Sequence, residues 1–169
     1  MKFTLVNLPK IALALFFFTI ATAFTGCNKS NSQSASAKTE NGPVIEFRRT
    51  VCFGTCPIYQ ATVARNGKVT FTGVRFIDKI GSFEARIPET EVQQLLTEID
   101  TVTFFDRDTL YVTGATDLPS MILRVRNHGK YHTIRTEGEG PEEVEKLMQR
   151  IDRVIMNAIR MDGKPVKTE

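Results

Sequence analysis

The sequence has no tryptophan, two histidines and three cysteines among its 169 residues. It also lacks a Gly-x-Ser-x-Gly elbow, a phosphate-binding Walker loop, a His-Glu-x-x-His zinc motif and a Gly-x-Gly-x-x-Gly fingerprint. These absences remove the usual residues of nucleophilic, metal-dependent and nucleotide-dependent catalysis. We therefore expect a protein without catalytic residues and without a cofactor, although an enzyme that works with carboxylates alone stays open.

Excess charge of one sign is missing as well. The formal net charge is +3, but residues 1–27 hold Lys2 and Lys10 and no acidic residue, which leaves 20 basic residues against 19 acidic ones. The basic residues after position 43 are scattered along the chain instead of gathered in one run. A nucleic-acid partner is therefore not expected.

The N-terminus has the layout of an export signal. Lys2 and Lys10 flank an uncharged start, and an apolar run of 14 residues, Ile11 to Phe24, leads to small residues. This run is shorter than the roughly 20 apolar residues of a membrane-spanning helix. Residues 1–26 are therefore predicted to be a signal peptide.

The end of this segment, Phe24-Thr25-Gly26-Cys27, resembles the bacterial lipobox, with Phe24 in place of the usual leucine. The resemblance implies that Cys27 is lipidated and anchors the mature chain in a membrane. Asn28 is not the aspartate associated with inner-membrane retention, so the outer membrane is favoured, on its periplasmic side. The alternative is a plain signal peptide with Cys27 as a free thiol. Residues 27–43 are polar and small and are predicted to be a flexible tether.

A single α+β domain is predicted over residues 44–160, with a frayed tail at 161–169. Apolar residues at helical spacing follow Pro88 and Pro141, and each proline is followed by acidic residues that suit a helix N-terminus. Alternating apolar residues predict an antiparallel sheet of about six strands, with both amphipathic helices on one face. The expected strands are 44–50, 58–65, 68–77, 82–87, 121–126 and 130–135.

Two parts of this domain look alike. Each predicted helix follows a predicted hairpin, and Val92 and Asp100 of the first helix match Val144 and Asp152 of the second at an offset of 52. Two hairpin-helix units are one interpretation, and chance likeness between two amphipathic helices is the other. Asn66-Gly67 predicts a type I′ turn in the first hairpin.

Cys52 and Cys56 are the residues with the most distinctive chemistry. An exported protein meets an oxidising compartment, and the spacing with Gly54 between them suits a structural disulfide. The alternative is thiol redox chemistry or Cu(I) binding with His132, because Cys-x-x-x-Cys-Pro resembles the copper motif of cytochrome oxidase assembly proteins.

The longest irregular stretch, residues 106–119, is a candidate partner-binding loop. Its polar residues are Asp106, Asp108, Tyr111 and Asp117. Long loops carry binding residues more often than other segments do. Calcium binding by these carboxylates is the alternative.

The run Cys52-Phe53-Gly54-x-Cys56-Pro57-x-Tyr59, followed by Asn66-Gly67 and by residues 116–119, resembles a family of uncharacterised secreted domains common in lipoproteins of Bacteroidota. The resemblance covers about Val44 to Ile159 and implies a fold and a cellular setting but no activity. We therefore expect a lipid-anchored cell-envelope protein that is a binding or structural module, with the membrane and an envelope protein as its partners.

Overall fold

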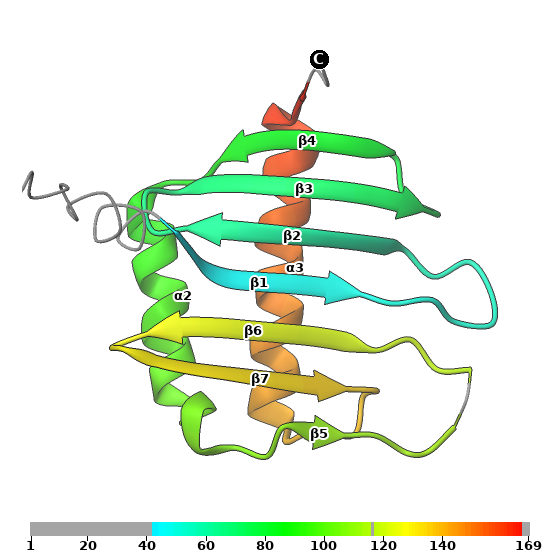
Figure 1. Ribbon diagram of the computed structural model, residues 1–169, viewed down its shortest axis with the longest axis vertical. Helices are drawn as coiled ribbons and strands as arrows, with labels where there is room; N and C mark the ends of the chain where they lie inside the picture. Colours follow the sequence, from blue (N-terminus) through cyan, green and yellow to red (C-terminus); the bar gives the residue numbers. More distant parts are fainter. Residues whose placement is uncertain (1–41, 116, 167–169) are drawn as a thin grey trace, which may run out of the picture. The chain divides into compact units, whose positions relative to one another are not determined.

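The computed structural model describes residues 42–115 and 117–166 (Figure 1). The predicted signal peptide, the lipidation site Cys27 and the tether up to residue 41 lie outside the described residues, as do Thr116 and residues 167–169. Within the described ranges, no helix combines the length and the apolar character that a bilayer crossing requires.

The described chain forms one mixed sheet and two helices. Both predicted helices and all six predicted strands are present, at nearly the expected bounds. The elements are β1 (Pro43–Arg49), β2 (Ile58–Ala64), β3 (Lys68–Arg75), β4 (Gly81–Arg86), α2 (Glu89–Thr101), the 3₁₀ turn η1 (Phe104–Asp106), β5 (Leu110–Tyr111), β6 (Met121–Asn127), β7 (Lys130–Thr136), α3 (Glu142–Asp162) and β8 (Lys164–Pro165).

The sheet has eight strands in the order β5-β7-β6-β1-β2-β3-β4-β8, which corrects the prediction of six. Strand β1 is central because it pairs antiparallel with both β2 and β6. The two additional strands are two residues long and lie at the edges. Strand β5 pairs parallel with β7, so the sheet is not wholly antiparallel, and β8 pairs antiparallel with β4. Residues 164–165 are thus part of the sheet, and the prediction of a frayed tail is wrong for them.

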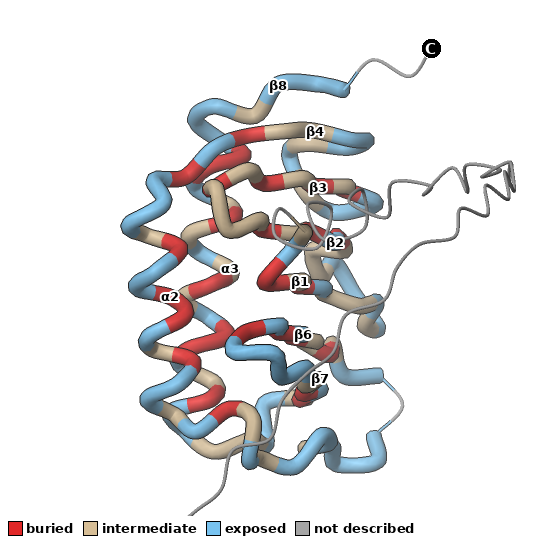
Figure 2. Tube along the Cα trace, turned by 60° about the vertical axis from the view of Figure 1, so that its left-hand side comes forward, coloured by how far each residue is buried: buried red, intermediate tan, exposed pale blue. Residues whose placement is uncertain are grey.

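The two helices cover one face of the sheet and leave the other face open (Figures 1 and 2). Each helix begins directly after a proline, Pro88 or Pro141, and acidic residues in the first turn interact favourably with the positive end of the helix dipole. The predicted apolar stripes are buried against the sheet (Figure 2). Burial of the apolar stripe of each helix holds the two helices against the sheet.

The core lies between this helical layer and the inward-facing residues of the strands. Alternate residues of β1, β2 and β3 point inward, because side chains alternate along a strand. Three of them form an aromatic row across neighbouring strands. The ring centroids of Phe47 and Tyr59 are 6.0 Å apart, and those of Tyr59 and Phe71 are 5.1 Å apart.

The two hairpins turn in different ways. The β6–β7 turn is type I′, since both central residues, His128 and Gly129, have positive φ. In the β2–β3 turn only Gly67 has positive φ, and its N–H donates to the carbonyl of Ala64 at 3.0 Å. The connection is therefore a three-residue turn, and the predicted type I′ turn at Asn66-Gly67 is wrong. A Cβ on Gly67 would lie 2.0 Å from the carbonyl oxygen of Ile87, so the backbone of the neighbouring segment occupies that space.

Candidate functional site

Three connections gather at one end of the sheet, where β1, β3 and β5 end and β2, β4 and β6 begin (Figure 1). We call this region the loop end, and it comprises residues 50–57, 76–80, 112–115 and 117–120. Because β1 lies between β2 and β6, its connection to β2 comes beside the segment that leads into β6. Segments about 65 residues apart in the sequence thus meet at one place.

The first and third connections are joined by backbone hydrogen bonds. The N–H of Thr50 donates to the carbonyl of Ser120 at 3.0 Å, and the N–H of Ser120 donates to Oγ1 of Thr50 at 2.9 Å. The N–H of Phe53 donates to the carbonyl of Asp117 at 3.1 Å. These bonds connect the cysteine segment to the predicted partner-binding loop, so two stretches that the sequence analysis singled out form one surface.

A disulfide between Cys52 and Cys56 closes the first connection, with a Cα–Cα distance of 5.9 Å. The N–H of Gly54 donates to the carbonyl of Cys52 at 3.0 Å and tightens the turn inside the ring. The predicted pairing of these two cysteines is therefore present. The bond fixes the shape of the segment that carries Phe53.

The strands on either side of this connection, β1 and β2, are both bound by the carboxylate of Asp152. Arg49 ends β1, Tyr59 lies near the start of β2, and the two residues are direct partners in the β1–β2 ladder. Both side chains point inward to Asp152 of α3, where Nη1 of Arg49 and the hydroxyl of Tyr59 donate to different carboxylate oxygens. The strand ends that flank the disulfide-closed connection are thereby attached to helix α3.

The environment of Tyr59 keeps its hydroxyl protonated. Burial raises the pKa of Tyr59 well above its ordinary value, and the negative charge of Asp152 and the hydrogen bond to it raise the pKa further. The nearby charge of Arg49 acts in the opposite direction with a smaller effect. A tyrosine held in this way is a hydrogen-bond donor that ties the layers together, and its buried hydroxyl is not available to a ligand.

Large apolar side chains are exposed on the connections of the loop end. Phe53 is 91% exposed, and the other two connections also carry exposed aliphatic or aromatic side chains beside the charged Asp78, Lys79 and Asp117. The stapled segment 50–57 has no charged residue. We call the exposed set the apolar loop residues, and its members are Val51, Phe53, Phe76, Ile80, Val112 and Leu118. Soluble monomers rarely expose many large apolar side chains close together, and where they do the area is often an interaction site.

The acidic candidates of the partner-binding loop do not form one cluster. Asp117 lies at the loop end and contacts Phe53 through its backbone, whereas Asp106 ends η1 and precedes β5. The backbone N–H of Asp108 donates to the hydroxyl of Tyr111 at 3.2 Å. No group of three metal-binding side chains occurs within residues 42–115 and 117–166.

His132 lies away from the two sulfur atoms. It is on β7, and strands β6 and β1 separate β7 from β2 in the sheet. Its ring packs edge-on against Phe104 with the centroids 5.5 Å apart, and its Nε2 is buried without a hydrogen-bond partner among the described residues. The structure therefore does not bring Cys52, Cys56 and His132 together as a ligand set.

Two features were not predicted from the sequence, namely the contact of Asp152 with Arg49 and Tyr59 and the exposure of the apolar loop residues. A carboxylate that directly follows the buried Ile151 was one available signal for the contact. Apolar residues inside turn segments, such as Phe53 and Phe76, were the signal for the surface.

These observations define a disulfide-stapled α+β domain with one helical layer and with exposed apolar side chains on its loops. The chain matches the domain of unknown function DUF6438 over residues 43–155. It therefore belongs to the DUF6438 family. No curated protein matched the chain.

Proposed function

We propose that this protein is a lipid-anchored, non-catalytic binding module of the cell envelope, which holds a protein partner through its apolar loop residues. The observation that carries the proposal is the set of exposed apolar side chains on the connections at one end of the sheet, two of which are held together by interloop hydrogen bonds beside the disulfide. A fixed loop loses little conformational entropy on binding, which favours affinity.

The place where the chain enters the domain supports a partner beyond the anchoring membrane. The predicted tether joins β1 at Pro43, and the loop end begins after Arg49, at the other end of this strand. Seven residues of strand span about 23 Å. A protein held through Cys27 and the tether thus attaches at one end of the sheet and presents its apolar loop residues at the other.

The chemistry of the loop end supports a protein partner over a charged ligand. The stapled segment carries no charge, and Phe53 projects as a single large apolar side chain. Buried aromatic side chains dominate the energetics of protein interfaces when they fill a pocket on the partner. Phe53 is therefore expected to be the central contact residue.

Site-specific photocrosslinking tests the binding surface. A photoreactive amino acid is placed at position 53 of the full-length protein in cells, and the control is position 161, because Met161 is an 81% exposed apolar residue at the end of α3. We expect one saturable protein adduct from position 53. Binding of the purified, identified partner should weaken at least about tenfold in Phe53→Ala and less than about twofold in Met161→Ala. Identical adducts from both positions, or no adduct from position 53, would contradict the proposal.

Metabolic labelling with a palmitate analogue tests the anchor separately. We expect label in the wild-type protein and in the double variant Cys52→Ser/Cys56→Ser, and none in Cys27→Ser. The soluble fraction should gain the Cys27→Ser protein, because a lipid chain supplies the membrane affinity. Label that persists in Cys27→Ser would show that Cys27 is not the site of lipidation.

A further inference from the structure

The face of the sheet opposite the helices is uncovered by the described residues (Figure 1). Its composition follows from strand alternation, because residues next to the buried positions of each strand point outward. Thr62 faces Thr70, Gln60 faces Thr72, and Glu46 faces Arg124 across neighbouring strands. We call this surface the open sheet face, and it is separate from the loop end.

Basic residues that are scattered in the sequence gather on the open sheet face. Glu46 and Glu84 are the two acidic residues that point outward from strands β1 to β7. Six basic residues share the face with them, namely Arg48, Lys68, Arg86, Arg124, Arg126 and Arg135. The face thus carries an excess of positive charge although the domain as a whole is nearly neutral.

Not all of this charge is neutralised within the domain. Arg124 pairs with Glu46 at 3.0 Å, and Lys68 pairs with Glu84 at 2.7 Å. Within the described ranges, neither Arg48 nor Arg126 forms an ion pair. Two guanidinium groups, each with a fork of donors that fits carboxylate and sulfate oxygens, are therefore free to bind an anionic ligand.

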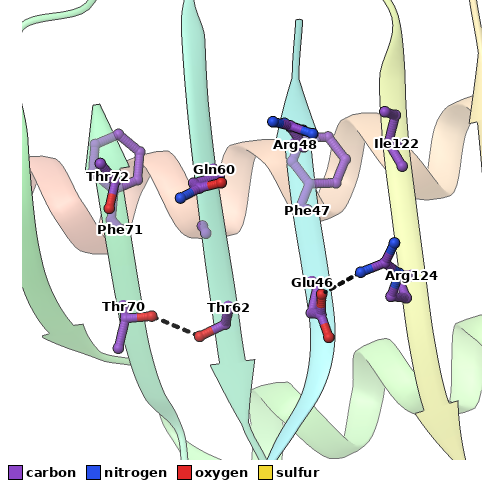
Figure 3. Close-up of a pocket in the computed structure, with 11 residues that line it drawn as sticks. Glu46, Phe47, Arg48, Gln60, Thr62, Thr70, Phe71, Thr72, Ile122 and Arg124 are labelled. Atoms are coloured by element: carbon purple, nitrogen blue, oxygen red, sulfur yellow. Dashed lines mark hydrogen bonds and ion pairs between the residues drawn. The ribbon is translucent and has the colours of Figure 1, made fainter. Parts of the chain in front are cut away.

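The middle of the face is a shallow depression of about 280 Å³, where hydroxyl and amide groups lie beside Arg48 and beside the ion pair of Glu46 with Arg124 (Figure 3). The hydroxyls of Thr62 and Thr70 are hydrogen-bonded to each other at 2.6 Å, and Gln60 and Thr72 lie in the next row beside Arg48 (Figure 3). Neutral donors and acceptors beside the free guanidinium group of Arg48 suit a ligand that has both hydroxyl groups and acidic groups, and Arg126 lies on the same face outside the depression.

One aromatic side chain flanks this polar centre. Tyr131 of β7 is 54% exposed, and the guanidinium carbons of Arg126 and Arg124 lie 5.6 Å and 5.9 Å from its ring centroid. These contacts hold the two arginines beside the ring. The tyrosine therefore offers one exposed ring surface at the edge of the charged area.

We infer that the open sheet face binds an acidic polysaccharide, such as a polymer of uronic acids or sulfated sugars. The free guanidinium groups of Arg48 and Arg126 would bind the acidic groups, and Gln60, Thr62 and Thr70 would bind sugar hydroxyls. A shallow, open depression fits an extended polymer better than a small compact ligand, which needs deeper enclosure.

Other partner classes fit this face less well. A protein interface needs a desolvated apolar core, and of the apolar residues that line the depression Phe47, Ala61 and Phe71 are buried, which leaves Ile122 as the one that points outward. Single-stranded nucleic acids bind through several aromatic residues on which successive bases stack, and the strands β1 to β7 place one aromatic ring, that of Tyr131, on this face. An acidic sugar polymer requires neither feature.

The test measures binding of the full-length protein to polygalacturonate, with neutral dextran as the uncharged comparison. The double variant Arg48→Gln/Arg126→Gln removes the two free guanidinium groups. The matched control, Arg153→Gln/Arg160→Gln, removes the same charge from exposed positions of α3. We expect wild-type binding to polygalacturonate that is absent with dextran, a loss of at least about tenfold in the face variant, and a change below about twofold in the control.

A second pair of variants separates sugar recognition from charge attraction. Thr62→Val/Thr70→Val keeps shape and charge but removes both hydroxyl groups, and we expect binding to weaken about threefold to fivefold. Unchanged thermal unfolding of each variant shows that the fold is retained, because these side chains are on the surface.

Several results would overturn the inference. They are no binding to polygalacturonate at low salt, an equal loss in the α3 control, or no effect of the threonine variant. Equal or tighter binding of polyglutamate or of oligothymidylate at matched charge would assign the face to an acidic protein or to a nucleic acid instead.

Discussion

Asp100 and Asp152 occupy matching positions in the two helices, yet they have different surroundings. Each follows a buried isoleucine, and the buried residues of α2 recur in α3 at the same offset of 52. The side chain of Asp152 is 15% exposed and binds Arg49 and Tyr59. The side chain of Asp100 is 41% exposed, and its Oδ2 lies 3.0 Å from Nε2 of His128.

The difference comes from what lies opposite each helix position. Asp152 faces the central strands β1 and β2, whose residues Arg49 and Tyr59 are held in register by the sheet. Asp100 is in the last turn of α2 and faces the exposed β6–β7 turn. The same helix pattern thus gives a buried attachment in one place and a solvated contact in the other. Burial, more than the identity of the acid, decides how much each contact stabilises the fold.

Removal of the buried carboxylate should have the largest effect. In Asp152→Ala, Arg49 loses its ion pair and the buried hydroxyl of Tyr59 loses its acceptor. We expect the free energy of unfolding to fall by about 3 kcal/mol, at the lower end of the values for broken buried pairs because Arg49 keeps some contact with water. Urea unfolding of the wild-type and variant proteins measures this difference. A loss no larger than that of Asp100→Ala would show that the two sites are equivalent.

Removal of the tyrosine hydroxyl should cost about 2 kcal/mol at neutral pH, since a hydrogen bond to a charged acceptor is lost. The change Tyr59→Phe keeps the aromatic row with Phe47 and Phe71. Urea unfolding at pH 7 checks the value, with Tyr131→Phe as the control on an exposed tyrosine.

The raised pKa of Tyr59 predicts that its contribution to the free energy of unfolding depends on pH. The folded-state pKa of Tyr59 is raised, so the stabilisation is fully present below the unfolded pKa of 10.0 and is lost as the pH rises above it. There the unfolded chain releases the proton and the folded chain keeps it, and the free energy of unfolding should fall by about 1.4 kcal/mol per pH unit. The difference between wild type and Tyr59→Phe should therefore shrink above pH 10. A constant difference up to pH 11.5 would contradict this assignment.

The disulfide next to this site should contribute at most about 2 kcal/mol, because it closes a short ring and removes little entropy from the unfolded chain. The double variant Cys52→Ser/Cys56→Ser should still fold, since Asp152 continues to hold both flanking strands. Urea unfolding of this double-cysteine variant with and without Asp152→Ala shows whether the disulfide and Asp152 stabilise the fold independently. Additive losses would mean that the staple and the carboxylate act independently.

Much of the fold could be predicted because its signals are local. Pro88 and Pro141 mark the helix starts, and the apolar stripes after them identify the buried helix faces. The edge strands β5 and β8 could not be predicted, because two residues are too few to show an alternating pattern. The turn at Gly67 was assigned to the wrong type, and its surroundings are not local, because its carbonyl accepts a hydrogen bond from the N–H of Ile87 at 3.0 Å.

The candidate site could be predicted only in pieces. The cysteine pair and Asp117 were both singled out from the sequence, but the hydrogen bond of Asp117 to Phe53, which lies between the cysteines, depends on β1 lying between β2 and β6. The pairing of Asp152 with Arg49 depends on the same strand order. The charge of the open sheet face was missed for a related reason, because the basic residues of β1 and β6 come to one surface only when these two strands pair.

The smallest effect is expected at the exposed aspartate. In Asp100→Ala the ring of His128 and Nδ2 of Asn127 lose an acceptor, but His128 is exposed to water and Asn127 keeps the hydrogen bond that its Oδ1 accepts from Nη2 of Arg65 at 3.2 Å. We expect a loss of about 0.5 kcal/mol, as for other exposed charged contacts. Urea unfolding in about 0.1 M and about 1 M salt provides the check, because screening should remove most of so exposed an interaction. A loss near that of Asp152→Ala, unaffected by salt, would contradict this prediction. It would mean that Asp100 at the β6–β7 turn stabilises the fold as strongly as Asp152 does at the ends of β1 and β2.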